Sequence, residues 1–220
     1  MQNIQFINTT VKMPMMGLPV QSPVVQIGEK YILISPGSQI TDEQYKALPK
    51  LTDIVAPNLF HHGGVRKAAI QNPQANLWQC KGLEAKANDI KWNKELSKEN
   101  WPYQNELQMF VLDGMPNVNE VVFYHKPSKS LIVTDLCFNM LGLKGLGPKI
   151  ILSLFGTYNK FAVSRLFTKE IKDKNAFKKS LFPIFACDFE NIIVSHGENV
   201  IGNGKKLLRE ALKERGLEPI

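Results

Sequence analysis

Residues 120–139 read EVVFYHKPSKSLIVTDLCFN and contain the clearest hairpin pattern in the chain. Its two halves are rich in β-branched and aromatic residues and are separated by the turn-forming sequence KPSK, which predicts an antiparallel hairpin. Glu120 opens the first strand and Asp135 follows the second, so both lie at one end of the hairpin. His125 lies at the turn, roughly 13–16 Å from Asp135 at the usual rise of a strand. We therefore interpret His125 as a turn residue and not as a partner of Asp135.

Three further histidine positions complete a candidate metal site. His196 follows an apolar run, as Asp135 does, and so ends another predicted strand. His61 and His62 lie in the loop 57–64, where two glycines allow the backbone to approach another group closely. Three imidazoles and one carboxylate are a donor set that suits Zn(II), Fe(II) or Mn(II). The alternative interpretation is that the loop histidines are surface residues and that Asp135 caps a turn.

The rest of the chain mixes short strands and helices without a strict β-α-β-α order. Strands are predicted at 24–27, 31–34, 53–56, 76–80, 107–112 and 191–195, and helices at 42–47, 65–70 and 205–215. Segment 86–102 is polar and rich in asparagine, which is typical of a surface excursion, and 136–180 is a long insert. This order favours a mixed sheet or a two-sheet sandwich covered by helices over a doubly wound parallel sheet.

Composition narrows the class of protein. The 220 residues, 44% hydrophobic and 21% charged, are typical of one globular domain. The net charge of +7 suits an anionic partner, but no run of lysine and arginine is dense enough to indicate nucleic-acid binding. Cys80, Cys137 and Cys187 are far apart, which argues against a disulfide framework and a cysteine-based zinc site. Without a secretory signal or an apolar stretch of ~20 residues, we expect a cytoplasmic protein with no transmembrane segment.

Three of the segments described above resemble segments of the metallo-β-lactamase superfamily. The hairpin 120–139 resembles the hairpin that ends on that superfamily's bridging aspartate. Residues 54–62 resemble its first metal loop, and residues 192–197 its last metal histidine. More narrowly, the chain is similar to the DUF4336 group, and the resemblance extends from about residue 20 to about residue 212.

The resemblance implies a fold. This is an α/β fold (α+β in some schemes), a four-layer αββα metallo-β-lactamase-like sandwich of two mixed sheets flanked by helices. We expect a single domain over residues 1–220, with a helical insert at about 136–180. The metal site of such a sandwich lies at one edge of the two sheets.

The departures from the superfamily pattern imply a reduced site. The first metal loop normally reads His-x-His-x-Asp-His, and here those positions look like Pro57, Leu59, His61 and His62. No histidine occurs in residues 113–117, where the resemblance places another ligand. All three histidines of the first metal position are therefore missing. The remaining residues could hold one divalent ion, and zinc is expected in preference to iron or manganese. The alternative is that the site binds no metal. Its expected ligands are His61, His62, Asp135 and His196.

The implied function is a mononuclear metal-dependent hydrolase of an ester, thioester or phosphoester. Asp135 would act in catalysis as a ligand, and Glu120 would accept a proton or orient a ligand imidazole. The alternative for Glu120 is a solvated carboxylate. Apolar and basic residues in the insert 136–180 suit an anionic, amphipathic small-molecule substrate, or else form ordinary helices packed on the sandwich. The alternative function is a non-catalytic binding or structural protein with a vestigial metal site.

Overall fold

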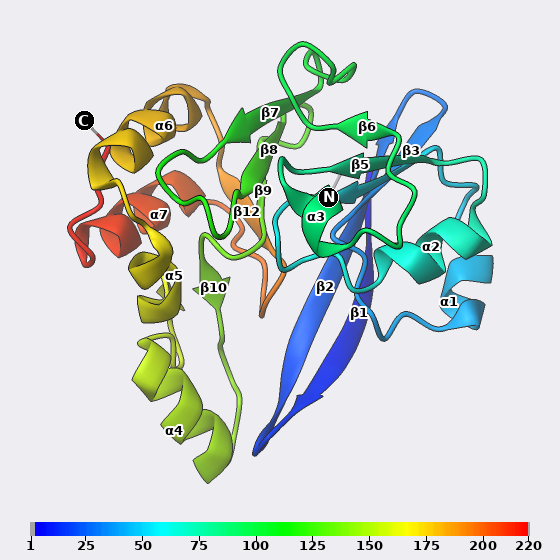
Figure 1. The fold of residues 1–220 in the computed structure, drawn as a ribbon. Helices are drawn as coiled ribbons and strands as arrows, with labels where there is room; N and C mark the ends of the chain where they lie inside the picture. Colours follow the sequence, from blue (N-terminus) through cyan, green and yellow to red (C-terminus); the bar gives the residue numbers. More distant parts are fainter. Residues whose placement is uncertain (1–2, 220) are drawn as a thin grey trace.

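The computed structural model describes residues 3–219, and their strands form two mixed sheets that pack face to face (Figure 1). The strand order is β1-β2-β3-β4-β5-β6 in the first sheet and β12-β9-β8-β7 in the second, and β10 and β11 form a separate pair. The strands are β1 (Ile4–Met13), β2 (Met16–Ile27), β3 (Lys30–Ile34), β4 (Asp53–Ala56), β5 (Asn76–Gln79), β6 (Lys94–Glu95), β7 (Leu107–Val111), β8 (Val121–His125), β9 (Ser130–Val133), β10 (Phe138–Asn139), β11 (Phe161–Ala162) and β12 (Asn191–Val194). The helices are α1 (Asp42–Lys46), α2 (Val65–Gln71), α3 (Leu83–Lys86), α4 (Leu146–Phe155), α5 (Arg165–Glu170), α6 (Lys174–Ala186) and α7 (Gly204–Lys213).

The second sheet is covered on both faces. Phe123, Ile132 and Ile193 belong to the core between the two sheets. Their neighbours in sequence belong to the core beneath the helices: Val122, Tyr124, Leu131, Val133, Ile192 and Val194. Successive strand residues point to opposite faces, so both faces of this sheet are buried. Helices α6 and α7 pack on its outer face, and α2 packs on β4 of the first sheet. The layers therefore follow the predicted order of helix, sheet, sheet and helix.

The predicted hairpin is present as β8 and β9, with Phe123 opposite Ile132. Strand β12 runs parallel to β9, with Val194 opposite Val133. Asp135 and His196 each lie two residues beyond that last pair. Both therefore leave the second sheet at the same edge, which places the two predicted ligands side by side.

His125 lies at the turn end of the hairpin, as predicted, but it is more than a turn residue. It is the last residue of β8 and is fully buried. Its Nδ1 lies 2.7 Å from the Ser128 hydroxyl, which belongs to the turn. The buried imidazole ring therefore links the end of strand β8 to the hairpin turn.

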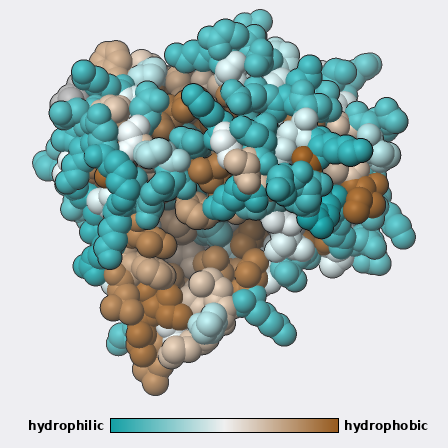
Figure 2. Space-filling view, viewed as in Figure 1, coloured by the Kyte–Doolittle hydropathy of each residue, from teal (hydrophilic) through white to brown (hydrophobic). Residues whose placement is uncertain are grey.

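The long β1–β2 hairpin is the main element that the sequence does not predict. Only its last part, 24–27, shows a strand pattern. The preceding residues are rich in asparagine, threonine and glutamine, and Pro14, Pro19 and Pro23 weaken the pattern further. The hairpin and α4 extend from the same end of the molecule, and apolar side chains gather there (Figures 1 and 2).

Two loop predictions also change. Segment 86–102 is not a surface excursion throughout, because Leu96 and Trp101 are buried in the core between the sheets. The insert 136–180 contains β10 and β11 as well as helices, and α6 continues through Pro183. Burial of apolar side chains overrides the polar composition of the first segment, and α6 extends beyond the predicted end of the second.

Candidate metal centre

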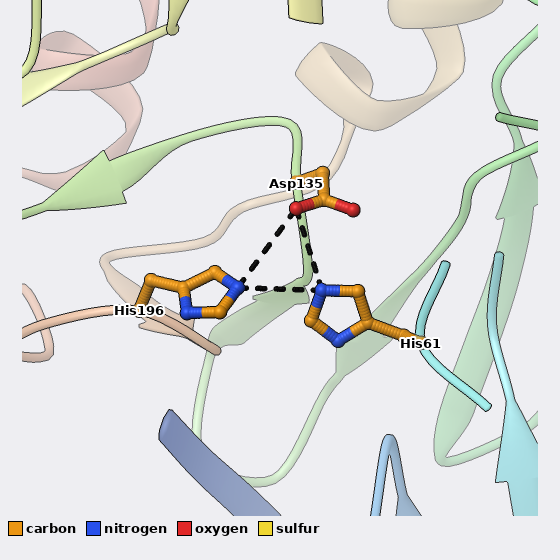
Figure 3. A group of neighbouring side chains, drawn as sticks. All are labelled: His61, Asp135 and His196. Atoms are coloured by element: carbon orange, nitrogen blue, oxygen red, sulfur yellow. Dashed lines mark hydrogen bonds and ion pairs between the residues drawn. The ribbon is translucent and has the colours of Figure 1, made fainter. Parts of the chain in front are cut away.

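Three side chains from distant parts of the sequence converge at one edge of the sandwich (Figure 3). Asp135 follows β9 and His196 follows β12, both in the second sheet. His61 lies in the loop after β4 of the first sheet. The packing of the two sheets brings this loop against the edge from which Asp135 and His196 emerge. The three-residue cluster is therefore a product of the fold and not of any local motif.

The donor atoms of this cluster have the spacing of ligands around one ion. His61 Nε2 lies 3.3 Å from Asp135 Oδ1 and 3.3 Å from His196 Nε2. His196 Nε2 lies 3.9 Å from Asp135 Oδ1. Ligands at ~2.0–2.2 Å from a tetrahedral ion are about 3.3–3.6 Å apart. Two of the three distances fall in this range and the third is about 0.3 Å longer, so this His/Asp/His group could hold a zinc-sized ion after a small adjustment.

The surroundings of His196 direct its Nε2 toward the other two side chains of the cluster. Its Nδ1 lies 3.3 Å from the carbonyl oxygen of Pro19. A carbonyl oxygen only accepts, so Nδ1 carries the proton and Nε2 the lone pair that a metal needs. Phe138 stacks on the ring at 5.2 Å and 10° and fixes its plane. The Nδ1 atom of His61 is similarly occupied, 2.6 Å from the Ser35 hydroxyl oxygen.

Asn58 holds the second oxygen of Asp135. Its fully buried amide donates from Nδ2 to Asp135 Oδ2 at 2.8 Å and to Thr134 Oγ1 at 2.9 Å. Its Oδ1 accepts from the backbone N–H groups of Phe60 and His61. Those two donors fix the orientation of the amide. Asn58 therefore positions the His61 loop and the carboxylate together, with Oδ1 of Asp135 left toward the cluster.

Glu120 is neither a solvated carboxylate nor a partner of an imidazole. It is fully buried, and it accepts hydrogen bonds of 2.9 to 3.2 Å from the backbone N–H groups of residues 134–136. Burial and the nearby charge of Asp135 raise the pKa of Glu120 to about 7, against the opposing effect of those N–H donors. Because its oxygens are taken by the backbone, Glu120 positions Asp135 and does not touch a ligand ring. We predicted that Glu120 orients a ligand imidazole, but in the structure it orients the carboxylate of Asp135.

Asp135 and His196 favour the protonation states that bind a cation, whereas His61 is held toward its protonated form by the neighbouring carboxylates. Burial raises the pKa of Asp135, but the charges and hydrogen bonds of His61, His196 and Asn58 outweigh it and lower that pKa well below its usual range. Burial and the adjacent His61 lower the pKa of His196 to about 4. Burial also lowers the pKa of His61, but the contacts with Asp135 and the charge of Glu120 raise it overall. At neutral pH, Asp135 is therefore anionic and His196 neutral.

Comparisons with known proteins identify the fold. No family model matches the sequence, and no curated protein matches it. A metallo-β-lactamase from Pontibacter korlensis has a TM-score of 0.66 at 14% identity, covering 98% of this chain and 96% of its own. The chain has the metallo-β-lactamase fold. The metallo-β-lactamase FIM-1 from Pseudomonas aeruginosa, in its mono-zinc form, gives 0.62 at 17% identity (97% and 92% covered). A metal-soaked flavodiiron core from Synechocystis gives 0.66 at 11% identity (97% and 59% covered).

On this metallo-β-lactamase scaffold, His62 does not join the cluster. Among residues 3–219, the metal-ligating atoms that lie within 4.8 Å of one another here belong to His61, Asp135 and His196. His62 instead lines a separate surface pocket beside α2. Its pKa is lowered by burial and by the charge of Lys86. The expected set of four ligands is therefore reduced to three, because the turn that leads into α2 directs the two adjacent histidines to different places.

Asn58 is a residue of the site that the sequence analysis missed. The signal for it was an asparagine two residues after the buried strand β4, where a polar side chain needs a buried partner.

The site opens into an apolar groove. Two adjoining cavities of about 350 and 230 Å³ are both lined by Asp135, Phe138, Ser164 and Leu166. His196 lines the second cavity, together with Met16 and other apolar residues of the β1–β2 hairpin and α4. Concave, apolar walls with a few polar groups at one place are typical of small-molecule sites. The insert therefore forms one wall of the candidate site.

Proposed function

We propose that this protein is a hydrolase that uses one divalent metal ion, zinc, held by His61, Asp135 and His196. The observation that supports this proposal best is the spacing of the three donor atoms, together with the proton that the Pro19 carbonyl places on Nδ1 of His196. The proposed substrate is a small molecule with an ester, thioester or phosphoester bond and an apolar portion that lies in the groove.

The chain's own residues would have distinct roles in this reaction. A zinc ion held by these residues would supply Lewis acidity and would lower the pKa of water toward neutrality. Asp135 contributes the negative charge of the site, and the two imidazoles contribute neutral donors. Asn58 and Glu120 keep the carboxylate in place. Phe138 and Leu166 bind the apolar part of the substrate and exclude water from it.

The same residues favour one ion over two. The Asn58 amide donates to Asp135 Oδ2. That oxygen is the one a second metal would need from a bridging aspartate. We therefore infer a mononuclear site, as in the mono-zinc form of FIM-1, and we propose that the chain is a member of the DUF4336 group.

The test compares metal content in matched histidine variants. Protein purified without a His tag is analysed by elemental mass spectrometry as the wild type, His61→Ala, His196→Ala and His62→Ala. We expect about one zinc per chain in the wild type and in His62→Ala, and little in the other two. His62→Ala is the control, because it removes a neighbouring imidazole that lies outside the cluster.

Hydrolysis is then measured on nitrophenyl esters of short and long acyl chains, a thioester and a phosphodiester. We expect turnover of at least one of these compounds by the zinc-loaded wild type and its loss in His196→Ala. Absence of metal from the wild type after incubation with zinc, iron or manganese would refute the metal site. Metal binding without turnover of any of these compounds would instead favour a non-catalytic binding protein.

A further inference from the structure

Exposed apolar side chains gather at one end of the molecule. Six of the twelve large hydrophobic residues that are exposed in the described part of the chain come from the β1–β2 turn and from α4 with the loop before it. Figure 2 shows this brown area at the lower end of the molecule, next to the hollow of the groove. We call these residues the apolar tip: Met13, Met15, Leu141, Leu146, Ile150 and Leu154. Surface hydrophobic residues usually lie singly, and a contiguous group marks an interaction surface.

Helix α4 is apolar on both of its faces. Leu146, Ile150 and Leu154 are spaced four residues apart and form an exposed stripe, in which Leu146 is 77% exposed and Leu154 67%. Leu152 on the other face is buried against the β1–β2 hairpin and the residues around β10. A helix that is hydrophobic all round is normally covered on every side. The exposed stripe of α4 therefore lacks its cover within the described chain.

The two parts of the apolar tip are held together as one surface. Gly147, in the first turn of α4, lies so close to the Met15 carbonyl oxygen that a Cβ atom there would overlap with it. A glycine at this place lets the start of the helix pack directly on the turn of the hairpin. The turn of the hairpin and helix α4 therefore lie at the same end of the molecule (Figure 1).

All charged side chains in the segments that form the apolar tip are positive. No acidic residue occurs between Asp135 and Glu170, or anywhere in residues 3–28. Lys12, Lys144 and Lys149 lie within these segments and are exposed. Apolar side chains with lysines at their border, and with no carboxylate among them, are complementary to the surface of an anionic bilayer. A protein partner with basic residues is less well matched, since residues 3–28 and 136–169 contain no carboxylate side chain to pair with them.

We propose that the apolar tip inserts into the surface of an anionic lipid bilayer. None of the described helices is long and apolar enough to span a membrane. Helix α4, at about 15 Å in length, instead lies in the interface with its stripe toward the acyl chains. The lysines contact lipid headgroups. The groove that leads to the candidate metal centre opens beside this end of the molecule. When the protein is bound, the opening of the groove would therefore lie next to the membrane surface. The proposal does not depend on hydrolysis or on a bound metal.

The test measures binding to vesicles with a matched charge control. Sedimentation with vesicles of phosphatidylcholine alone, or mixed equally with phosphatidylglycerol, is compared for three forms of the full chain. These are the wild type, Leu146→Glu/Leu154→Glu, and Ile70→Glu/Ile201→Glu, whose two sites are equally exposed but lie elsewhere. We expect the wild type and the second double variant to bind the anionic vesicles. Leu146→Glu/Leu154→Glu should bind these vesicles at least about tenfold less tightly, because burial of each leucine among the acyl chains contributes to the binding free energy. Circular dichroism melting checks that each variant is folded.

A third variant tests the contribution of charge. Lys144→Gln/Lys149→Gln should weaken binding to the anionic vesicles about fivefold per lysine and leave binding to neutral vesicles unchanged. Equal binding of the two glutamate variants, or absence of wild-type binding to the anionic vesicles, would overturn the proposal. So would a concentration-dependent dimer of the wild type that Leu146→Glu/Leu154→Glu abolishes, since a second copy would then cover the tip.

Discussion

Glu120 is a buried carboxylate beside a second carboxylate, and it is tolerated because three consecutive backbone N–H groups donate to it. Glu120→Gln leaves one carbonyl oxygen for those donors and adds an NH₂ group that cannot accept. We expect the free energy of unfolding to fall by about 2–4 kcal/mol, since buried donors lose their acceptor. Zinc affinity should fall about 10- to 100-fold, because Asp135 is no longer fixed. Urea denaturation and a zinc-binding titration measure the two effects.

Glu106→Gln is the control for this substitution. Glu106 is an exposed carboxylate just before β7, and its loss should change stability by less than about 0.5 kcal/mol. A Glu120→Gln protein as stable as Glu106→Gln would show that the three backbone donors find other acceptors. The positioning role assigned to Glu120 would then be wrong.

His125 should make the fold sensitive to acid. Burial lowers its pKa from an ordinary 6.5 to about 4, and no hydrogen-bond partner of Nε2 is present among residues 3–219. The folded state therefore binds this proton less well than the unfolded state does. Stability contributed by neutral His125 is complete above about pH 6.5 and is lost as the pH falls toward 4, by up to about 3 kcal/mol. Urea denaturation at several pH values should show a shallower loss in His125→Gln. Identical pH slopes for both proteins would refute this assignment.

At the scale of elements, Gly197 links the end of β12 to β10. Its φ is +99°, and a Cβ atom there would overlap with the Asn139 carbonyl oxygen. Gly197→Ala should therefore move the adjacent His196 and reduce zinc affinity at least about tenfold. Gly202→Ala is the control, because Gly202 also has a positive φ of +79° but has open space around it. Both variants should lose about 1–2 kcal/mol of stability from backbone strain. Equal zinc affinity in the two would mean that β10 does not position His196.

The elements that the sequence predicts are those whose own residues carry the pattern. The β8–β9 hairpin has two apolar runs and a turn sequence, so its end and the place of Asp135 follow from local rules. Helix α1 likewise begins with a capping box at Thr41, which is readable from sequence. The β1–β2 hairpin shows no such pattern, because much of it projects beyond the core and keeps polar side chains. Its role in the site, through the Pro19 carbonyl, could not be foreseen.

The metal cluster is predictable only in part for a related reason. Strand ends place Asp135 and His196 at one edge, and parallel pairing then sets them side by side. The choice between His61 and His62 depends on how a turn directs two adjacent side chains, which no periodicity encodes. Asn58 acts through a hydrogen bond to a residue 77 positions away in sequence, and its partner is apparent only once both sheets are packed.

At the scale of the whole molecule, the core between the sheets joins both halves of the chain. Phe123 of β8 is fully buried in it, with its ring 5.3 Å from that of Trp101. The three tryptophans lie in residues 78–101, beside the first sheet, whereas α6 and α7 cover the second. Tryptophan fluorescence therefore reports mainly on one sheet, and far-ultraviolet circular dichroism receives a large contribution from helices on the other.

This arrangement predicts that the chain unfolds as one cooperative unit. In a urea titration of the wild type, the fluorescence and circular dichroism transitions should coincide, as expected for a single domain. Phe123→Ala should lower the unfolding free energy by about 3–5 kcal/mol and shift both transitions equally, because the cavity it leaves destabilises the contact between the sheets. Phe182→Ala, at a side chain that is 65% exposed, should cost less than about 1 kcal/mol. Two separate transitions, with only one moved by Phe123→Ala, would mean that the sheets fold independently and that the metal centre forms by docking of two preformed halves.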